Sequence, residues 1–185
     1  IDFLVTAGTI SDWNMEGLPT DSLSIQNGIL ITRSSRFPML VDPQGQALSW
    51  IRRREANSVC SLNGLKNGIT TLTHPKFKEQ LETCLEGGFT LIVTGIENEL
   101  DPLLDPLLEG DFFYKGTHKK IRMMDREYDV DSKFKMYFFT RLPNPRFSAE
   151  LQAKTSVIDF TVTRNGLEEQ LLGRVISHEK AALEE

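Results

Sequence analysis

Five short apolar runs constrain the fold of this chain more than any other feature. Each has the length of a β-strand, and turn or helix signals separate it from the next. The runs cover residues 37–41, 69–72, 89–93, 134–139 and 157–162. The run at 89–93 is almost continuously apolar, which is typical of a strand buried on both faces. The last run alternates apolar and polar residues, which predicts that one of its faces is more polar.

Helical patterns fall between these runs. Pro75 stands where the first turn of a helix is expected, and Gly87-Gly88 ends the segment. Its apolar side chains repeat at helical spacing: Phe77, Leu81, Cys84 and Leu85. A second helix is expected over residues 46–56. Strands that alternate with helices predict one α/β domain with a mostly parallel, helix-covered sheet.

Two further segments depart from this alternation. Residues 119–124 and 127–130 are β-like around a turn at Asp125-Arg126, which predicts an inserted β-hairpin before the fourth strand. Near the end, Asn165 and Glu168 have the spacing of a capping box. The helix that it would open has an apolar stripe made of Leu167, Leu171, Leu172, Val175 and Ile176.

Composition excludes several classes of function. The 21 basic and 26 acidic residues give a net charge of −5 without a basic stripe, so nucleic acid is not an expected partner. No apolar run approaches the roughly 20 residues that a membrane span needs. The 3 histidines and 2 cysteines share no ligand spacing, so neither a metal site nor a disulfide is expected, in keeping with a cytoplasmic location. The chain starts without methionine and ends in a helical pattern, so we expect it to be part of a larger protein.

The loop after the first strand is the first place where chemistry is expected, because ligands of open α/β sheets bind beyond the carboxyl ends of the strands. A phosphate-binding loop at this position reads GxxxxGK followed by Ser or Thr. Here the first glycine, the second glycine and the lysine are replaced. The loop consists of Asp42, Pro43, Gln44, Gly45, Gln46, Ala47, Leu48 and Ser49.

Each replacement has a physical consequence. Asp42 places a carboxylate close to where a phosphate would bind, and like charges repel. Ala47 adds a Cβ where the backbone must curl around the phosphates. Leu48 removes the ammonium group that stabilises phosphoryl transfer. Two interpretations of the loop stay open, a degenerate phosphate-binding loop and an ordinary strand-to-helix turn.

Two other strand ends carry weaker signals. After the third run, a hydrolase needs acidic residues for Mg²⁺ and water, and this chain has Thr94-Gly95 instead. Thr140 and Asn144 follow the fourth run, where a polar side chain can sense a terminal phosphate. The prolines on either side of Asn144 are equally typical of a turn.

Seven strings of residues extend over nearly the whole chain in a fixed order. They are WNMEGLP at 13–19, QNGI at 26–29, DPQGQ at 42–46, NELDP at 98–102, LPNP at 142–145, IDFTVT at 158–163 and GLEEQLL at 166–172. Together they resemble the fifth AAA+ module of dynein heavy chains. The string KTSVIDF at 154–160 is more similar to axonemal than to cytoplasmic dyneins, and most similar to the outer-arm group.

This resemblance implies a P-loop NTPase-like three-layer sandwich with a five-stranded parallel sheet of strand order 5-1-4-3-2. Residues 1–35 would form a leading segment that packs on the module, residues 36–163 the large α/β subdomain, and residues 164–185 the start of a helix toward a small helical subdomain. In the family, six modules form a ring within one chain, and the fifth does not hydrolyse ATP. The resemblance therefore implies no cofactor in this segment, with ATP and Mg²⁺ bound at other modules of the parent chain.

The resemblance also implies a mechanical role and a set of partners. The module would relay ATP-driven changes between ring, linker and microtubule-binding stalk in minus-end-directed movement in the ciliary or flagellar axoneme. Its partners would be neighbouring modules, the linker, the stalk support and other dynein subunits, with microtubules bound through the parent stalk. The inserted hairpin, with Lys119, Asp125 and Arg126, is the candidate linker-docking surface. The candidate contacts to a neighbouring module's nucleotide are Arg141, Arg146 and Lys154. The alternative function is a regulatory nucleotide-binding module with a substituted loop.

Overall fold

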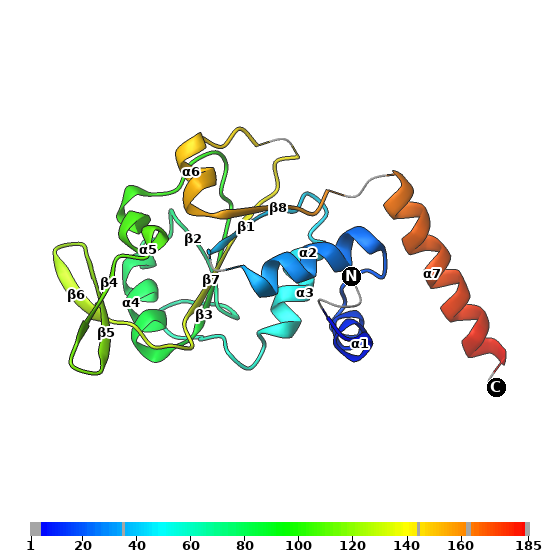
Figure 1. The fold of residues 1–185 in the computed structure, drawn as a ribbon, viewed down its shortest axis with the longest axis horizontal. Helices are drawn as coiled ribbons and strands as arrows, with labels where there is room; N and C mark the ends of the chain where they lie inside the picture. Colours follow the sequence, from blue (N-terminus) through cyan, green and yellow to red (C-terminus); the bar gives the residue numbers. More distant parts are fainter. Residues whose placement is uncertain (1–4, 35, 144, 162–163, 184–185) are drawn as a thin grey trace.

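A five-stranded parallel sheet forms the centre of the protein, as seen in a computed structural model that describes residues 5–34, 36–143, 145–161 and 164–183 (Figure 1). The strand order is β2-β3-β7-β1-β8, and every neighbouring pair is parallel. The strands are β1 (Pro38–Val41), β2 (Ile69–Thr71), β3 (Thr90–Thr94), β7 (Lys135–Thr140) and β8 (Ser156–Asp159). Each predicted apolar run supplies one of these strands, so the predicted α/β fold with a parallel sheet is confirmed. The last strand ends at Asp159, earlier than its run.

Alternate residues of the strands enter two separate hydrophobic cores, one on each face of the sheet. Met39, Met136 and Phe138 belong to the first core, whereas Leu40 and Phe139 belong to the second. Because successive side chains of a strand point to opposite faces, a continuously apolar strand is the expected sequence for a sheet covered on both sides. This accounts for the apolar middle of the central strands, whose polar residues Thr90, Thr94, Lys135 and Thr140 stand at the strand ends.

Helices cover both faces and give the three-layer arrangement. The face of the first core is covered by α4 (Phe77–Gly87), η1 (Pro102–Leu104), α5 (Asp105–Glu109) and α6 (Ala149–Lys154), and the other face by α1 (Ala7–Met15), α2 (Ser22–Arg33) and α3 (Gln46–Arg54). The helix predicted at Pro75 begins at Phe77, because residues 74–77 form a turn in which the Phe77 amide donates to the His74 carbonyl at 3.0 Å. The helix predicted over 46–56 ends at Arg54.

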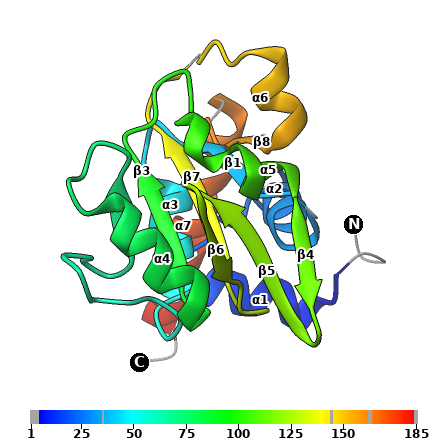
Figure 2. The same ribbon diagram turned by 90° about the vertical axis from the view of Figure 1, so that its left-hand side faces the viewer.

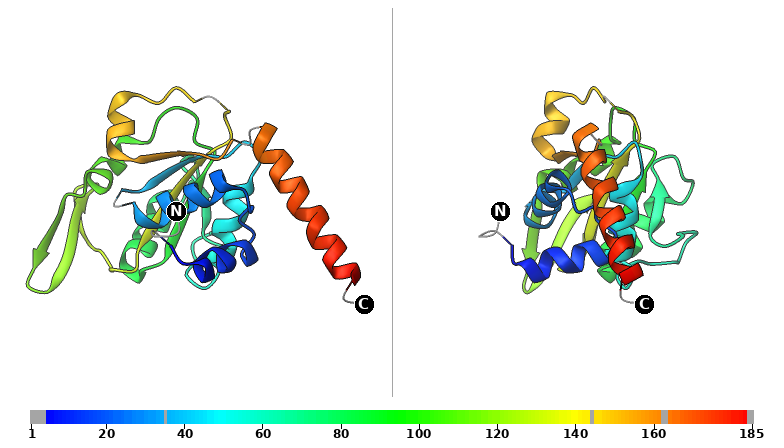
Figure 3. Two further views of the ribbon diagram at one scale, coloured as in Figure 1. Left: turned by 45° about the vertical axis from the view of Figure 1, so that its right-hand side comes forward. Right: turned by 90° about the vertical axis from the view of Figure 1, so that its right-hand side faces the viewer.

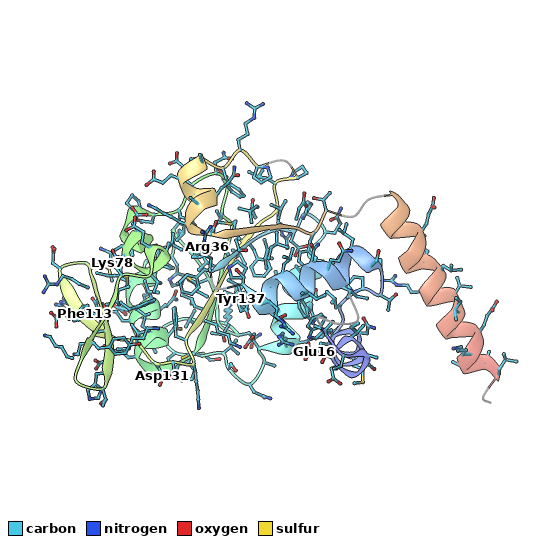
Figure 4. The ribbon with its side chains drawn as sticks, in the orientation of Figure 1. Glu16, Arg36, Lys78, Phe113, Asp131 and Tyr137 are labelled. Atoms are coloured by element: carbon cyan, nitrogen blue, oxygen red, sulfur yellow. The ribbon has the colours of Figure 1, made fainter. Side chains whose placement is uncertain are left out.

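The leading segment folds into α1 and α2, which the apolar runs did not predict. Trp13 of α1 packs edge-on against Trp50 of α3, with ring centroids 5.8 Å apart. The Trp50 indole nitrogen donates to Glu16 Oε2 at 3.0 Å, and Glu16 lies between α1 and α3 (Figure 4). From α2, the Asn27 amide group donates to the Asp159 carbonyl at 2.8 Å. These contacts attach the leading segment to α3 and to the edge strand β8.

The predicted hairpin is one part of a three-stranded antiparallel sheet that stands to one side of the parallel sheet (Figure 1) and faces the viewer in Figure 2. Its strands are β4 (Phe112–Lys115), β5 (His118–Met123) and β6 (Arg126–Asp129). The predicted turn at Asp125-Arg126 is wrong by one residue, because Met124 and Asp125 have the positive φ angles of 52° and 58° that a two-residue hairpin loop needs. Strand β4 is short and half-exposed, and its sequence carries no clear alternation that would have predicted it.

The last helix, α7 (Arg164–Leu183), projects from the α/β body, as Figure 1 and the left view of Figure 3 show. Asn165 lies inside this helix, so the predicted capping box is wrong. The side chains of Leu171, Leu172, Val175 and Ile176 are between 45% and 61% exposed. The predicted apolar stripe is therefore present and faces solvent, apart from Leu167, whose side chain lies outside the described residues.

Candidate functional site

A cleft of about 480 Å³ lies at the carboxyl ends of the parallel strands. Its walls come from the loop after β1, from the segment after β3 and from the end of β7. The lining residues are Asp42, Gly45, Leu48, Ile69, Thr94, Gly95, Ile96, Glu97, Phe139, Arg141 and Leu142. This is the edge at which open α/β sheets bind their ligands. The sequence predicted the loop residues and the residues after β3, but not the apolar side chains of Ile69, Ile96 and Phe139. Ile69 and Phe139 belong to the strand runs, and Ile96 comes shortly after the run at 89–93. Only the fold shows that these three residues reach the cleft.

Asp42 turns inward at the start of the loop and is only 2% exposed. Its Oδ2 accepts a hydrogen bond from the Leu48 amide at 2.9 Å, and its own amide donates to the Thr140 carbonyl at 2.9 Å. The amides of Gly45, Gln46 and Ala47 lie close enough to the carboxylate to favour its charged form. A phosphate-binding loop directs this same set of amides at a phosphate. In this protein, the carboxylate of Asp42 occupies that position.

Burial and backbone amides act on Asp42 in opposite directions. Burial disfavours the charged carboxylate and raises its pKa above the ordinary value, while the amides of the loop and of the first turn of α3 lower it. The effect of burial is the larger of the two, so the pKa is raised. The other carboxylate oxygen, Oδ1, is buried without a hydrogen-bond donor.

The remaining loop residues are placed differently from those of a working phosphate-binding loop. Gly45 has φ +76° and forms the N-cap of α3, so its left-handed backbone turns the chain into the helix. Ala47 is fully buried in the second core, and Leu48 contributes an aliphatic side chain to the cleft. The Ser49 hydroxyl donates to the Gly45 carbonyl at 3.0 Å. Pro43 and Gln44 form the turn between strand and helix, and Gln46 is the first residue of α3.

The end of β3 brings no carboxylate into a buried position at the cleft. Thr94 and Gly95 both line the cleft, and the Thr94 hydroxyl is directed at the Thr70 carbonyl at 3.4 Å. Glu97 lines the cleft as an exposed residue. Asp101 caps η1, since its Oδ1 accepts from the Leu103 amide at 3.0 Å. The part of the chain that the structure describes contains no group of three His, Cys, Asp or Glu residues that could hold a metal ion.

The residues predicted to sense phosphate are not both in reach of the cleft. Thr140 is fully buried, and its hydroxyl accepts from the Leu142 amide at 3.2 Å, which supports the turn after β7. Thr140 therefore stands behind the cleft rather than in its lining. Asn144 lies outside the described residues.

The three candidate cations have different surroundings. Arg141 lines the cleft and is exposed, while Arg146 is exposed, with its backbone amide donating to Asn98 Oδ1 at 3.3 Å. Lys154 is mostly covered, and its ammonium group lies 3.4, 3.2 and 2.9 Å from carboxylate oxygens of Asp105, Glu109 and Glu150. These ion pairs, foremost the hydrogen bond to Glu150, raise the pKa of Lys154 and join α6 to α5. Of the three, only Arg141 reaches the cleft.

The candidate docking residues lie on the antiparallel sheet. Asp125 in the β5–β6 loop and Arg126 at the start of β6 are exposed. The Lys119 ammonium lies over the Phe112 ring, 4.1 Å from its centroid. On the outer face, Lys120–Asp129 and Arg122–Glu127 form cross-strand ion pairs at 3.1 Å. In both pairs the base lies on β5 and the acid on β6, and the hydrogen bonds that Glu127 accepts from Lys115 and Arg122 lower its pKa.

The layered parallel sheet, with a strand–loop–helix unit at its carboxyl edge, defines an α/β domain of the P-loop NTPase-like class. A family profile described as the ATP-binding dynein motor region matches residues 11–185, and the chain belongs to this dynein heavy-chain family.

Relatives support the same assignment over almost the whole chain. The chain is 51% identical over 183 residues to the dynein gamma chain of the flagellar outer arm from Chlamydomonas reinhardtii. It is 49% identical over 183 residues to axonemal dynein heavy chain 5 of Mus musculus, and 48% identical over 184 residues to axonemal dynein heavy chain 8 of Homo sapiens. These matches cover 99% or 100% of the chain and 4% of each relative. Among the described residues, no helix is long and apolar enough to span a membrane.

Proposed function

We propose that this chain is a non-hydrolysing ring module of an axonemal dynein motor, the fifth in the order of modules. The observation that carries the proposal is the Asp42 carboxylate at the start of α3, in the position where a phosphate would accept the same amides. A nucleotide phosphate would have to displace a buried, hydrogen-bonded carboxylate or bind next to it. Both alternatives are unfavourable for an anion.

Among the described residues, the loop and strand-end positions at which hydrolysis needs a cation, a metal-binding hydroxyl and a carboxylate carry other groups. Leu48 supplies no cation, the Ser49 hydroxyl donates within α3, and Thr94-Gly95 supplies no carboxylate for Mg²⁺. No Mg²⁺ or nucleotide cofactor is therefore assigned to this module. In the parent heavy chain, ATP and Mg²⁺ would bind at other modules.

The proposed role is mechanical. The module would act as a rigid member of the ring that passes ATP-driven motion from other modules to the linker and to the microtubule-binding stalk. Two exposed features favour contacts with other parts of the parent chain: the antiparallel sheet β4–β6 at one end and the apolar stripe of α7 at the other (Figure 1). Because the relatives are axonemal and flagellar outer-arm dyneins, we place the parent motor in the axoneme of a cilium or flagellum.

A regulatory nucleotide site is the second candidate function. The observation in its favour is the cleft, whose volume of about 480 Å³ lies within the range of small-molecule sites, roughly 300–1,000 Å³. In this alternative, a nucleotide would bind without being hydrolysed and would stabilise one arrangement of the ring.

Calorimetric titration of the 185-residue chain with Mg-ATP and Mg-ADP distinguishes the two candidates. We expect no binding at millimolar nucleotide. The double variant Asp42→Gly, Leu48→Lys restores two of the three missing features of the loop and should gain measurable affinity, whereas the matched variant Leu48→Met should not. Micromolar binding by the unmodified chain would reject the purely structural role and support the regulatory one.

A further inference from the structure

Two hollows adjoin at the amino edge of the parallel sheet, the edge opposite to the cleft after β1. Their volumes are about 560 Å³ and about 230 Å³. Both are lined by Arg36, Phe37 and Phe134, which precede the neighbouring strands β1 and β7. Arg36 and Tyr137, which both line the smaller hollow, lie near the centre of Figure 4. We call the two hollows together the amino-edge groove.

The described charged side chains that line the smaller hollow are all bases: Arg36, Arg54 and Lys135. Arg36 is exposed, and among the residues that the structure describes it forms no ion pair with a carboxylate. The side chains of Arg54 and Lys135 are 30% and 55% exposed. Solvent, and therefore a ligand, can reach all three cations, although the chain as a whole has a net charge of −5.

Two acids next to these bases do not neutralise all three. Glu16 lies 3.6 Å from Arg54, and Glu55 lies 3.5 Å from Lys135. Both distances exceed the roughly 2.7–2.9 Å of a strong charge-assisted hydrogen bond, and Glu55 also accepts from the Tyr137 hydroxyl. Among these described groups, one positive charge is in excess, and several N–H donors are left for another acceptor. The smaller hollow is therefore complementary to an anionic group.

The larger hollow supplies apolar surface instead of charge. Phe37 and Phe134 pack edge to face with ring centroids 6.2 Å apart, and both are half-buried, as is Phe112 on the far wall. The three bases and three acids that line this hollow balance, and Lys154 is held by acids of α5 and α6. An apolar side chain placed here would cover the aromatic edges from water.

We propose that the amino-edge groove binds an acidic segment of a protein partner. A carboxylate of that segment occupies the smaller hollow, and an adjacent apolar side chain packs on Phe37 and Phe134. The inference goes beyond the proposed function and does not depend on it, because the groove lies at the edge of the sheet opposite to the loop. It gives the module an interaction surface whose occupant is selected by charge and by apolar contact together.

Titration of the 185-residue chain with capped peptides, followed by NMR, tests the proposal. The probes are EELEE, its uncharged counterpart QQLQQ, and EEGEE, which lacks the apolar side chain. We expect EELEE to shift the amide signals of Phe37 and Lys135, with an affinity at least about tenfold above that of QQLQQ and about threefold above that of EEGEE. Equal affinity of EELEE and QQLQQ overturns the proposal. Inorganic phosphate is the fourth probe, and binding as tight as that of EELEE would also overturn it, because the groove would then hold any small anion.

Two matched variants locate the interaction. Arg36→Gln removes an exposed cation without breaking an ion pair to a described residue, so the chain should stay folded and its affinity for EELEE should fall at least about threefold. Arg52→Gln makes the same change of charge at an exposed position of α3 that does not line either hollow, and it should alter the affinity less than about twofold. Equal effects of the two substitutions overturn the assignment to the groove, since attraction to the overall charge would then suffice.

Discussion

The carboxylate of Asp42 accepts a hydrogen bond from the backbone amide of Leu48, six residues further along the chain, at 2.9 Å. These are two of the three positions at which the sequence departs from a phosphate-binding loop. The departures are therefore structurally linked: one supplies an internal anion, and the other replaces the cation that a nucleotide would need. The contact closes the loop on itself without a ligand.

The raised pKa of Asp42 predicts a specific dependence of stability on pH. Its folded-state pKa lies above the unfolded value, so its contribution is fully present below the unfolded value of 3.8 and is lost as pH rises through the folded pKa. As pH rises from 3.8 through the folded-state pKa of Asp42, the free energy of unfolding of the unmodified chain should therefore fall relative to that of Asp42→Asn. Urea denaturation of both chains at a series of pH values measures the difference.

Glu97→Gln provides the control for that experiment, because it removes an exposed carboxylate of the same cleft. The pH dependence of its free energy of unfolding should be nearly the same as that of the unmodified chain. If Asp42→Asn also has the same pH dependence as the unmodified chain, the environment assigned to Asp42 is wrong.

Gly28 allows the close contact between α2 and Trp13. A Cβ at Gly28 would lie 3.1 Å from carbons of the Trp13 ring and 3.2 Å from Leu18. Within a helix, Gly→Ala ordinarily stabilises by up to about 1 kcal/mol, whereas overpacking a tight contact costs about 1–3 kcal/mol. We therefore expect Gly28→Ala to lower the free energy of unfolding by about 1 kcal/mol, as measured by chemical denaturation.

Gly8 of α1 is the matched control, because it is exposed and a Cβ there would meet only the Thr6 hydroxyl at 3.8 Å. Gly8→Ala should be neutral or stabilising. A stabilising effect of both substitutions would show that the leading segment is not packed as described.

Much of the fold was predictable because the strands are buried on both faces. In such strands nearly every position is apolar, as at Met39 and Leu40, and the signal does not depend on knowing the neighbours. The leading helices were not predictable in this way. Their attachment depends on Trp13, Gly28 and Trp50, which are distant in sequence and meet only in the folded chain. Strand β4 was missed for the same reason, since pairing with β5 rather than its own sequence makes it a strand.

The candidate site was predictable in its position but not in its chemistry. The order strand, loop, helix indicated the carboxyl edge and the residues Asp42, Leu48 and Thr94. Repulsion between Asp42 and a phosphate was expected from charge alone. That Asp42 itself accepts the loop amides depends on the left-handed backbone of Gly45, which residue types do not specify.

A buried polar cluster at the opposite edge of the sheet gives a further prediction. The Tyr137 hydroxyl donates to Glu55 Oε1 at 3.0 Å, Thr90 donates to Oε2 at 3.2 Å, and Lys135 lies 3.5 Å from Oε1. Tyr137 lies near the centre of the molecule (Figure 4). Burial, and then the charge of Glu55, raise the pKa of Tyr137 well above its ordinary value. Tyr137→Phe should lower the free energy of unfolding by about 1–2 kcal/mol, because a buried carboxylate loses one of its donors.

Tyr128→Phe is the comparison for that substitution. The Tyr128 hydroxyl donates to the partly exposed Glu82 at 2.7 Å, and water can replace it there. Its loss should have the smaller effect in the same denaturation experiment. Equal effects would contradict the view that burial determines the contribution of Tyr137.

The exposed tip of the β5–β6 loop tests the docking role of the antiparallel sheet. Asp125 in the loop and Arg126 beside it at the start of β6 have exposed side chains, so reversing their charges in a full-length motor, with Asp125→Lys and Arg126→Glu, should leave the module folded. If the sheet contacts the moving linker, such a reversal places like charges in apposition and should slow or disturb stepping. Single-molecule motility on microtubules measures this, with ATP hydrolysis recorded in parallel.

Glu97→Gln in the same motor controls for a change of surface charge elsewhere on the module. Unchanged stepping in the double reversal removes the docking role from this sheet, whereas slowed stepping with continued ATP hydrolysis supports a mechanical defect over a catalytic one.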